Sequence, residues 1–327
     1  MAEHSVSRET LPTDQVRPRQ VVDTPDLALQ SSRQHAGDTP IARAAETAVQ
    51  VMAGQAGVLP RPPSVRILTV ANQKGGVGKT TTTVNVAAAL AFHGLRVLVL
   101  DLDPQGNAST ALGVPHQTGT PSVYEVLVDG MDLGGVINAV DGIPGLFAAP
   151  ATIDLAGAEI ELVSLVARES RLKRALESYL SVAEPFDYVL IDCPPSLGLL
   201  TVNALVAARE LFIPIQCEYY ALEGLGQLLR NIDLVKAHLN PELSISTILL
   251  TMYDARTKLA AQVADEVRRH FGERVLKTLI PRSIRISEAP SYGQTVMTYD
   301  PGSSGALSYL EAARELARQP SIPEEKS

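Results

Sequence analysis

The sequence predicts an α/β protein in which a doubly wound, mostly parallel β-sheet is flanked by helices. From residue 65 onward, short apolar runs rich in Val, Ile and Leu recur, and segments of helical periodicity separate them. Continuous apolar strands are typical of parallel sheets that are buried on both faces. A cluster of glycines and lysines lies between the first expected strand and the first expected helix. Ligands of such sheets bind at the carboxyl ends of the strands, which is where this cluster lies.

The expected elements alternate between strands and helices along the chain. The strands are expected over 65–71, 96–100, 145–150, 187–192, 210–215, 244–250 and 275–280. The helices are expected over 80–92, 154–182, 222–239, 257–271 and 303–318, and the first of them stops at Gly94. Strands joined through helices in this way pair in parallel.

Both ends of the chain differ in composition from its middle. Residues 1–63 hold seven prolines and many Gln and Ser, with little hydrophobic periodicity. We therefore expect a disordered extension over 1–63, a folded domain over 64–320 and a flexible tail over 321–327. Within the extension, apolar residues recur at helical spacing in 41–52. This segment is either a transient helix or a helix that docks on an additional protein partner.

Composition limits the classes of function. The chain has 327 residues, 45% of them apolar, which is enough for a large core. Its net charge of -8, taken alone, argues against a protein dedicated to binding nucleic acid. Neither Cys193 nor Cys217 has the spacing of a CxxC pair or a metal site, which favours reduced cysteines in a cytoplasmic protein. No apolar run is long enough for a membrane span, and the N-terminus lacks the apolar core of a signal peptide.

The glycine-rich turn has the features of a phosphate-binding loop. Its glycines let the backbone approach an anion, and the N–H groups of the loop and of the next helix then face the phosphates. Lys79 supplies charge to the β- and γ-phosphates, the Thr80 hydroxyl is a ligand for Mg²⁺, and Thr81 can bond the α-phosphate. The residues expected to bind the nucleotide are Lys74, Gly75, Gly76, Val77, Gly78, Lys79, Thr80 and Thr81.

This loop departs from the strict G-x-x-x-x-G-K-[ST] pattern, because Gln73 stands where the first glycine is expected. It also holds a second lysine, Lys74. In both respects "KGGVGKTT" resembles the deviant Walker A motif of the ParA/MinD class of P-loop ATPases, and the resemblance extends over 65–318. It implies that ATP is the cofactor, that Lys74 reaches the nucleotide of a second subunit, and that ATP binding produces a homodimer. The alternative is that Lys74 is a solvated charge.

Aspartates end two of the expected strands. Asp101 and Asp103 lie two residues apart, and both carboxylates are expected to approach the γ-phosphate. "VLVLDLDPQGN" resembles the second motif of the class, which implies that Asp103 orients the attacking water and acts with Lys74 and Lys79 in catalysis. "YVLID" resembles a Walker B strand, so Asp192 is expected to hold Mg²⁺ together with Thr80.

A local excess of positive charge stands out in the acidic chain. Between Asp254 and Arg285, eight Lys and Arg face four Asp and Glu, and such residues bind DNA phosphates without regard to base sequence. The segment resembles the C-terminal part of chromosomal-type ParA proteins. That resemblance implies that Arg256 and Arg285 contact nonspecific double-stranded DNA, and that Pro281 and Arg282 border the adenine. The alternative for each arginine is an exposed charge without a ligand.

Together the motifs predict a ParA-like ATPase that segregates chromosomal or plasmid DNA. The resemblance implies a cytoplasmic, nucleoid-associated protein whose weak ATPase is stimulated by a ParB-like centromere-binding protein. The alternatives are a MinD-like ATPase that positions division machinery and an orphan relative that positions a protein cluster. The end of the chain, "LARQPSIPEEKS", lacks the basic amphipathic helix with which MinD-like proteins bind membranes. We therefore expect no membrane partner.

Overall fold

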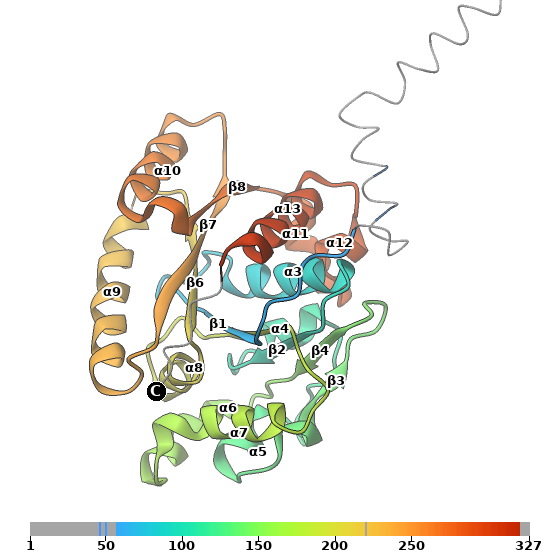
Figure 1. The fold of residues 1–327 in the computed structure, drawn as a ribbon, viewed down its shortest axis with the longest axis vertical. Coiled ribbons are helices and arrows are strands. Elements are labelled where there is room, and N and C mark those ends of the chain that lie inside the picture. Colours follow the sequence, from blue (N-terminus) through green and yellow to red (C-terminus); the bar gives the residue numbers. More distant parts are fainter. Residues whose placement is uncertain (1–45, 47–49, 51–56, 220, 321–327) are drawn as a thin grey trace, which may run out of the picture. The chain divides into compact units, whose positions relative to one another are not determined.

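The computed structural model describes residues 46, 50, 57–219 and 221–320. Two predicted segments lie outside the described residues: the tail over 321–327, and the extension up to residue 56 apart from Glu46 and Gln50. Most of the helix predicted within that extension therefore lies outside them too. The described residues form an eight-stranded sheet in the order β3-β4-β2-β5-β1-β6-β7-β8, with helices on both faces (Figure 1). The predicted doubly wound α/β fold is therefore confirmed.

The strands of this sheet are parallel except for β3, which pairs antiparallel with β4 at one edge. This arrangement gathers the carboxyl ends of the parallel strands on one side of the sheet. The strands are β1 (Arg66–Val70), β2 (Val97–Asp101), β3 (Asn138–Ala139), β4 (Leu146–Ala149), β5 (Tyr188–Asp192), β6 (Glu210–Gln216), β7 (Ser244–Tyr253) and β8 (Val275–Pro281).

Two layers of helices bury the faces of the sheet. One layer holds α3 (Lys79–Phe92), α4 (Asn107–Ala111), α11 (Ile284–Glu288), α12 (Val296–Tyr299) and α13 (Ser304–Arg318). The other holds α5 (Val123–Val128), α6 (Leu155–Glu161), α7 (Arg171–Leu180), α8 (Leu199–Ala207), α9 (Ala221–His238) and α10 (Lys258–Phe271). Short 3-10 helices are η1 (Leu133–Val136), η2 (Leu162–Ser164), η3 (Arg168–Ser170), η4 (Gly272–Arg274) and η5 (Ala289–Tyr292).

Alternate residues of the central strands face opposite layers. In β2, Val97 and Val99 pack into the layer of α3 and α13, whereas Leu98 and Leu100 pack into the layer of α5 to α10. Because both faces are covered, apolar residues occupy successive positions of these strands and not only every second one. The core also begins before the first strand, because Leu59 is buried and its N–H donates to the carbonyl of His93.

The helical region expected over 154–182 is interrupted, because two 3-10 turns separate α6 from α7. Ala167, between these turns, has a left-handed backbone with φ 52°. The buried amide of Asn203 in α8 donates to the carbonyl of Arg168 (2.8 Å) and accepts from the N–H of Leu172 (3.2 Å). A side chain far away in the sequence therefore satisfies the backbone at the break.

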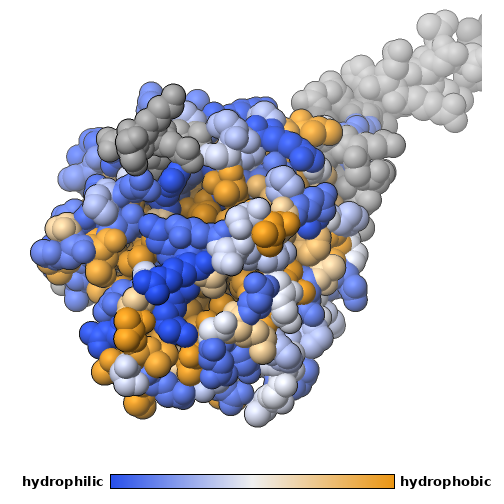
Figure 2. All heavy atoms as spheres, turned by 60° about the horizontal axis from the view of Figure 1, so that its bottom comes forward, coloured by the Kyte–Doolittle hydropathy of each residue, from blue (hydrophilic) through white to orange (hydrophobic). Residues whose placement is uncertain are grey.

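Some apolar side chains of this layer are exposed. Ile160, Val163 and Val166, on α6 and the segment after it, are 79%, 57% and 86% exposed. Figure 2, which brings the side of α5, α6 and α7 forward, shows apolar patches divided by polar residues. Scattered apolar residues are normal on protein surfaces and need no partner to explain them. None of the helices within the described ranges is long and apolar enough to cross a membrane.

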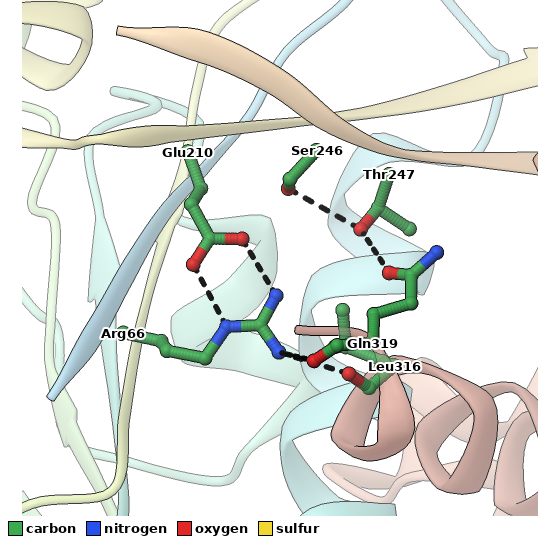
Figure 3. Close-up of polar contacts among 6 residues, drawn as sticks. All are labelled: Arg66, Glu210, Ser246, Thr247, Leu316 and Gln319. Atoms are coloured by element: carbon green, nitrogen blue, oxygen red, sulfur yellow. Dashed lines mark hydrogen bonds and ion pairs between the residues drawn. The ribbon is translucent and has the colours of Figure 1, made fainter. Parts of the chain in front are cut away.

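A buried ion pair joins the amino ends of β1 and β6 to the end of α13 (Figure 3). Arg66 donates to both carboxylate oxygens of Glu210, at 2.7 and 2.6 Å, and also to the carbonyl of Leu316 at 2.9 Å. The side chain of Gln319 accepts from the Thr247 hydroxyl at 2.9 Å. Breaking a buried pair on one side is costly, because the remaining charge keeps no partner.

Removing one partner of this pair should destabilise the fold. Arg66→Met should lower the free energy of unfolding by about 3–5 kcal/mol, because Glu210 stays buried without its cation. Arg209→Met is the matched control, because Arg209 pairs with Glu242 at 3.0 Å where both side chains are about half exposed. That variant should change the free energy by less than about 1 kcal/mol. Equal midpoints for the two variants in urea unfolding would contradict the importance of the buried pair.

Candidate nucleotide-binding site

Loops at the carboxyl side of the sheet surround a hollow of about 620 Å³. The sequence-predicted residues that line it are Gly75, Gly76, Gly78, Lys79, Thr80, Thr81 and Asp103. The remaining lining residues are Val84, Gln105, Asn107, Thr110, Ala111, Pro195, Met252, Pro290 and Ser291. The fold therefore brings the glycine-rich loop and the loop after β2 together around one space.

The glycine-rich loop needs glycine for its backbone conformation at two positions. Gly76 (φ 74°) and Gly78 (φ 85°) are left-handed, a conformation that strains residues with a side chain. Gly78 is the N-cap of α3, and Lys79 is the first residue of that helix. The first N–H groups of a helix have no partner inside it, and they carry the positive end of its dipole. The loop and α3 together are suited to an anion in the hollow.

A bulge in β7 contacts this loop. The sequence analysis did not identify the bulge. The buried Thr251 hydroxyl donates to the carbonyl of Val77 at 2.9 Å. The next residue, Met252, lines the hollow with φ 51°, where the pairing of β7 with β8 shifts register. A left-handed residue other than glycine in a strand is uncommon and tends to occur at functional sites. No pattern in "LLTMYD" indicates this conformation.

Lys79 is a buried cation beside buried carboxyl groups. Its side chain is largely enclosed, and its Nζ donates to the carbonyl of Lys74 at 3.4 Å. Burial lowers the pKa of Lys79, and the negative charges of Asp192 and Asp103 oppose that shift. The ammonium group keeps further donors for a phosphate, because an ammonium group has three hydrogens to donate.

Lys74 lies at the outer end of the loop and is one-third exposed. Its Nζ pairs with Glu218 at 2.9 Å, and its backbone N–H donates to the side chain of Asn72 at 3.1 Å. Gln216 also donates to the carboxylate of Glu218. The structure thus separates the two lysines, because Lys79 lines the hollow whereas Lys74 does not line it and pairs with Glu218. The predicted reach of Lys74 to a second subunit stays a prediction.

Asp192 has the surroundings of a magnesium ligand. It is fully buried, and its Oδ1 accepts from the Thr83 hydroxyl at 3.0 Å. Among the described residues, its Oδ2 has no hydrogen-bond partner. Burial, and then the charge of Asp101, raise the pKa of Asp192 to about 8, and the hydroxyls of Thr80 and Thr83 oppose the shift. A buried carboxylate oxygen beside a threonine hydroxyl fits Mg²⁺, which prefers oxygen ligands.

The two aspartates after β2 have different surroundings, and of the two only Asp103 lines the hollow. Asp101 is buried, and its Oδ2 accepts from the N–H and the hydroxyl of Ser109 at 2.8 and 2.7 Å. Burial raises the pKa of Asp101 to about 6. Asp103 lines the hollow, and its Oδ1 accepts from the N–H of Gln105 at 3.0 Å. Asp101 therefore organises the loop, and Asp103 is the carboxylate at the hollow.

The residues predicted to bind adenine and DNA lie outside the wall of the hollow. Pro281 and Arg282 were expected to border the nucleotide, but they do not line the hollow. Among the described residues, Met252, Pro290 and Ser291 line it instead. The N–H of Arg282 donates to the carbonyl of Tyr253 at 3.2 Å, which places the segment after β8 beside the end of β7. The adenine contact stays a prediction.

The two arginines predicted to contact DNA are exposed and lie beside acidic groups. Arg256 is 88% exposed and pairs with Asp254 at 2.7 Å. Arg285 is 55% exposed and pairs with Glu288 at 3.1 Å and with Asp300 at 3.3 Å. Both arginines are therefore exposed charges that already pair with carboxylates of the chain itself, and their contact with DNA stays a prediction.

Comparisons with known proteins place this site in context. A family model described as an AAA domain matches residues 65–245. The chain is 55% identical over 252 residues to the sporulation initiation inhibitor protein Soj of Bacillus subtilis, covering 77% of this chain and 98% of that protein. It is 51% identical over 254 residues to the chromosome partitioning protein ParA of Caulobacter vibrioides, covering 77% and 94%.

A solved structure is also similar to the chain. It is described as cobyrinic acid a,c-diamide synthase from Mycobacterium smegmatis with bound ATP analog and magnesium. It is 40% identical in sequence, the match covers 79% of this chain and 100% of that chain, and the TM-score is 0.67.

Magnesium-dependent nucleotide binding should weaken as the pH falls. Since burial raises the pKa of Asp192 to about 8, this carboxyl holds a proton below that pH, and Mg²⁺ must displace it. The gain in affinity that Mg²⁺ gives to a non-hydrolysable ATP analogue should fall by up to about tenfold per pH unit below pH 8. Calorimetric titrations with Mg²⁺ and with EDTA measure this gain at each pH.

The matched variant for this measurement is Asp192→Asn, which keeps the shape of the side chain but cannot ionise. It should bind the analogue equally with and without Mg²⁺. A magnesium gain that is the same at pH 6 and pH 8 in the wild type would contradict the assignment of Asp192.

Proposed function

Because the chain belongs to the Soj/ParA family of chromosome-partitioning ATPases, we propose that it binds ATP with Mg²⁺ and hydrolyses it to partition chromosomal or plasmid DNA. The relatives confirm the resemblance predicted from the motifs. The observation that carries the proposal is the hollow lined by Lys79, Thr80 and Asp103, together with the buried Asp192, whose Oδ2 has no partner among the described residues. The bound ATP analog and magnesium of the similar solved structure support the same cofactors here.

The residues predicted to bind the nucleotide and the metal have separate parts in this function. Lys79 and the start of α3 bind the β- and γ-phosphates, while Thr81 bonds the α-phosphate. Thr80 and Asp192 hold Mg²⁺, which when bound neutralises phosphate charge. Asp103 orients the attacking water. Phosphoryl transfer depends mainly on positioning and charge neutralisation, so these few groups are sufficient for slow hydrolysis. Pro281 and Arg282 border the adenine.

Lys74 connects the nucleotide to dimerisation. In a homodimer whose two nucleotides lie at the interface, Lys74 of each chain crosses to the phosphates bound by the other chain. Its one-third exposure at the outer end of the loop and its flexible side chain support this movement. The phosphates are the better partner for the ammonium, because they carry more charge than Glu218. ATP binding is thereby converted into a dimer.

The dimer is the DNA-binding form in this proposal. It binds nonspecific double-stranded DNA of the nucleoid through Arg256, Arg285 and neighbouring lysines and arginines. A ParB-like protein at the centromere stimulates hydrolysis, and the separated chains then leave the DNA. No observation favours the membrane-cycling alternative.

Dimerisation should fail without the second lysine. Lys74→Ala should stay monomeric in sedimentation velocity with Mg²⁺ and a non-hydrolysable ATP analogue, whereas the wild type dimerises. Its affinity for the nucleotide should change by less than about threefold, because Lys79 remains. Lys173→Ala is the matched control, because Lys173 is also an exposed lysine beside a glutamate, Glu177 at 3.9 Å, and it should dimerise normally. Normal dimers of Lys74→Ala would rule out the proposed bridge.

The acids beside Arg285 should restrain DNA binding. Glu288→Gln removes one carboxylate that pairs with Arg285, so the ATP-bound protein should bind nonspecific DNA about two- to fivefold more tightly. Glu242→Gln makes the same change of charge at another exposed pair, with Arg209 at 3.0 Å, and should leave DNA affinity unchanged. Fluorescence anisotropy at several salt concentrations measures both variants. Equal affinities of Glu288→Gln and the wild type would contradict a role of this pair.

A further inference from the structure

The loop that carries Asp103 is held by bonds of Gly106 and Thr110. The N–H of Gly106 donates to the carbonyl of Asp103 at 2.8 Å, which closes the loop into a tight turn. The carbonyl of Gly106 accepts from the N–H of Thr110 at 2.9 Å and lies 3.0 Å from its hydroxyl oxygen. Thr110 itself lines the nucleotide hollow. The position of the Asp103 loop therefore depends on how Thr110 is held.

His116 contacts Thr110 from outside the site. Its Nδ1 lies 2.8 Å from the carbonyl of Val114, which can only accept, so we infer that Nδ1 carries the proton of the neutral ring. Nε2 is then an acceptor, and it lies 3.1 Å from the Thr110 hydroxyl oxygen. The single proton of that hydroxyl is shared between the imidazole and the carbonyl of Gly106. The imidazole thus fixes the side chain that supports the loop.

The ring of His116 also fills the space beneath the loop. Gly106 is left-handed (φ 61°), and a side chain there would begin 3.2 Å from Cδ2 of His116 and 3.2 Å from the carbonyl oxygen of Ala151. His116 lines a second hollow of about 380 Å³ on this side, together with Gln105 and Ile153. Gln105 lines both hollows. The Asp103 loop therefore lies between the nucleotide hollow and the hollow that His116 lines.

We propose that His116 is a positioning residue for ATP hydrolysis, which holds the Asp103 loop in place through Thr110. The inference rests on the proposed ATPase function and adds a residue that does not touch the nucleotide. A carboxylate that orients water must be placed closely, because a shift of about 1 Å can cost up to about a hundredfold in rate. His116 acts on this placement and leaves the phosphate contacts of Lys79 and α3 unchanged.

The effect should therefore appear in kcat and not in nucleotide binding. His116→Ala should lower kcat about tenfold, while the Kd for a non-hydrolysable ATP analogue with Mg²⁺ changes by less than about twofold. His116→Gln carries an acceptor near the position of Nε2 and should recover most of the lost kcat. His270→Ala is the control, because His270 also places Nδ1 near a helix carbonyl, at 3.1 Å from Glu266, but on α10. It should leave kcat unchanged.

A double-mutant cycle separates positioning from a general loss of structure. Thr110→Val removes the hydroxyl and should lower kcat, and adding His116→Ala should cause less than about twofold further loss if the two act through one contact. Circular dichroism and thermal melting of each full-length variant check folding, and His116→Gln keeps the test valid if His116→Ala does not fold. Wild-type kcat in His116→Ala, no recovery in His116→Gln, or fully multiplicative losses would overturn the proposal. Absence of ATPase activity in the wild type would instead refute the proposed function.

Discussion

The gathering of acidic groups at the carboxyl ends of β2 and β5 is the constraint on which the site depends. Asp101 and Asp192 lie opposite each other in the register of these strands, and both are buried. Buried carboxylates this close disfavour each other's ionisation. Ser109 and Thr83 donate to them, and Lys79 adds a buried cation. A triphosphate brings further negative charge to this place, so a divalent cation that the acids can hold favours its binding.

The two ends of the sheet solve the problem of buried charge in different ways. At the amino ends, Arg66 and Glu210 satisfy each other, and Arg66 also binds the last turn of α13. At the carboxyl ends, Oδ2 of Asp192 has no partner among the described residues, and Lys79 keeps donors to offer. The first arrangement is complete in the chain alone and stabilises the fold. The polar groups at the carboxyl ends gain their remaining partners when a nucleotide and a metal bind. The fold therefore provides stability at one end of the sheet and binding at the other.

Features that arise from local pattern could be predicted from the sequence, whereas features that arise from distant contacts could not. The hollow unites Gly76, Lys79 and Asp103 as expected, because parallel strands bring their carboxyl ends together whatever the loops do afterwards. The interruption within 154–182 was not visible, because the amide that satisfies it belongs to Asn203. The contact between Thr251 and the phosphate loop could not be predicted either, because the sequence of an apolar strand does not indicate a left-handed bulge. The different surroundings of Asp101 and Asp103 likewise depend on Ser109, eight residues from Asp101.

The charge count also overstated how much positive charge a single chain offers to DNA. Glu288 and Asp300, which pair with Arg285, lie outside the stretch in which the positive excess was counted. In the proposed function, a DNA phosphate that binds Arg256 or Arg285 displaces a carboxylate of the chain, so the net gain at each arginine is small. In the proposed dimer, two such surfaces act on one DNA, and their binding free energies add, so the affinities multiply. Weak contacts of this kind distinguish dimer from monomer more sharply than strong ones do, because a strong contact would hold the single chain on DNA as well. Under this proposal, the neighbouring acids favour release when the dimer separates.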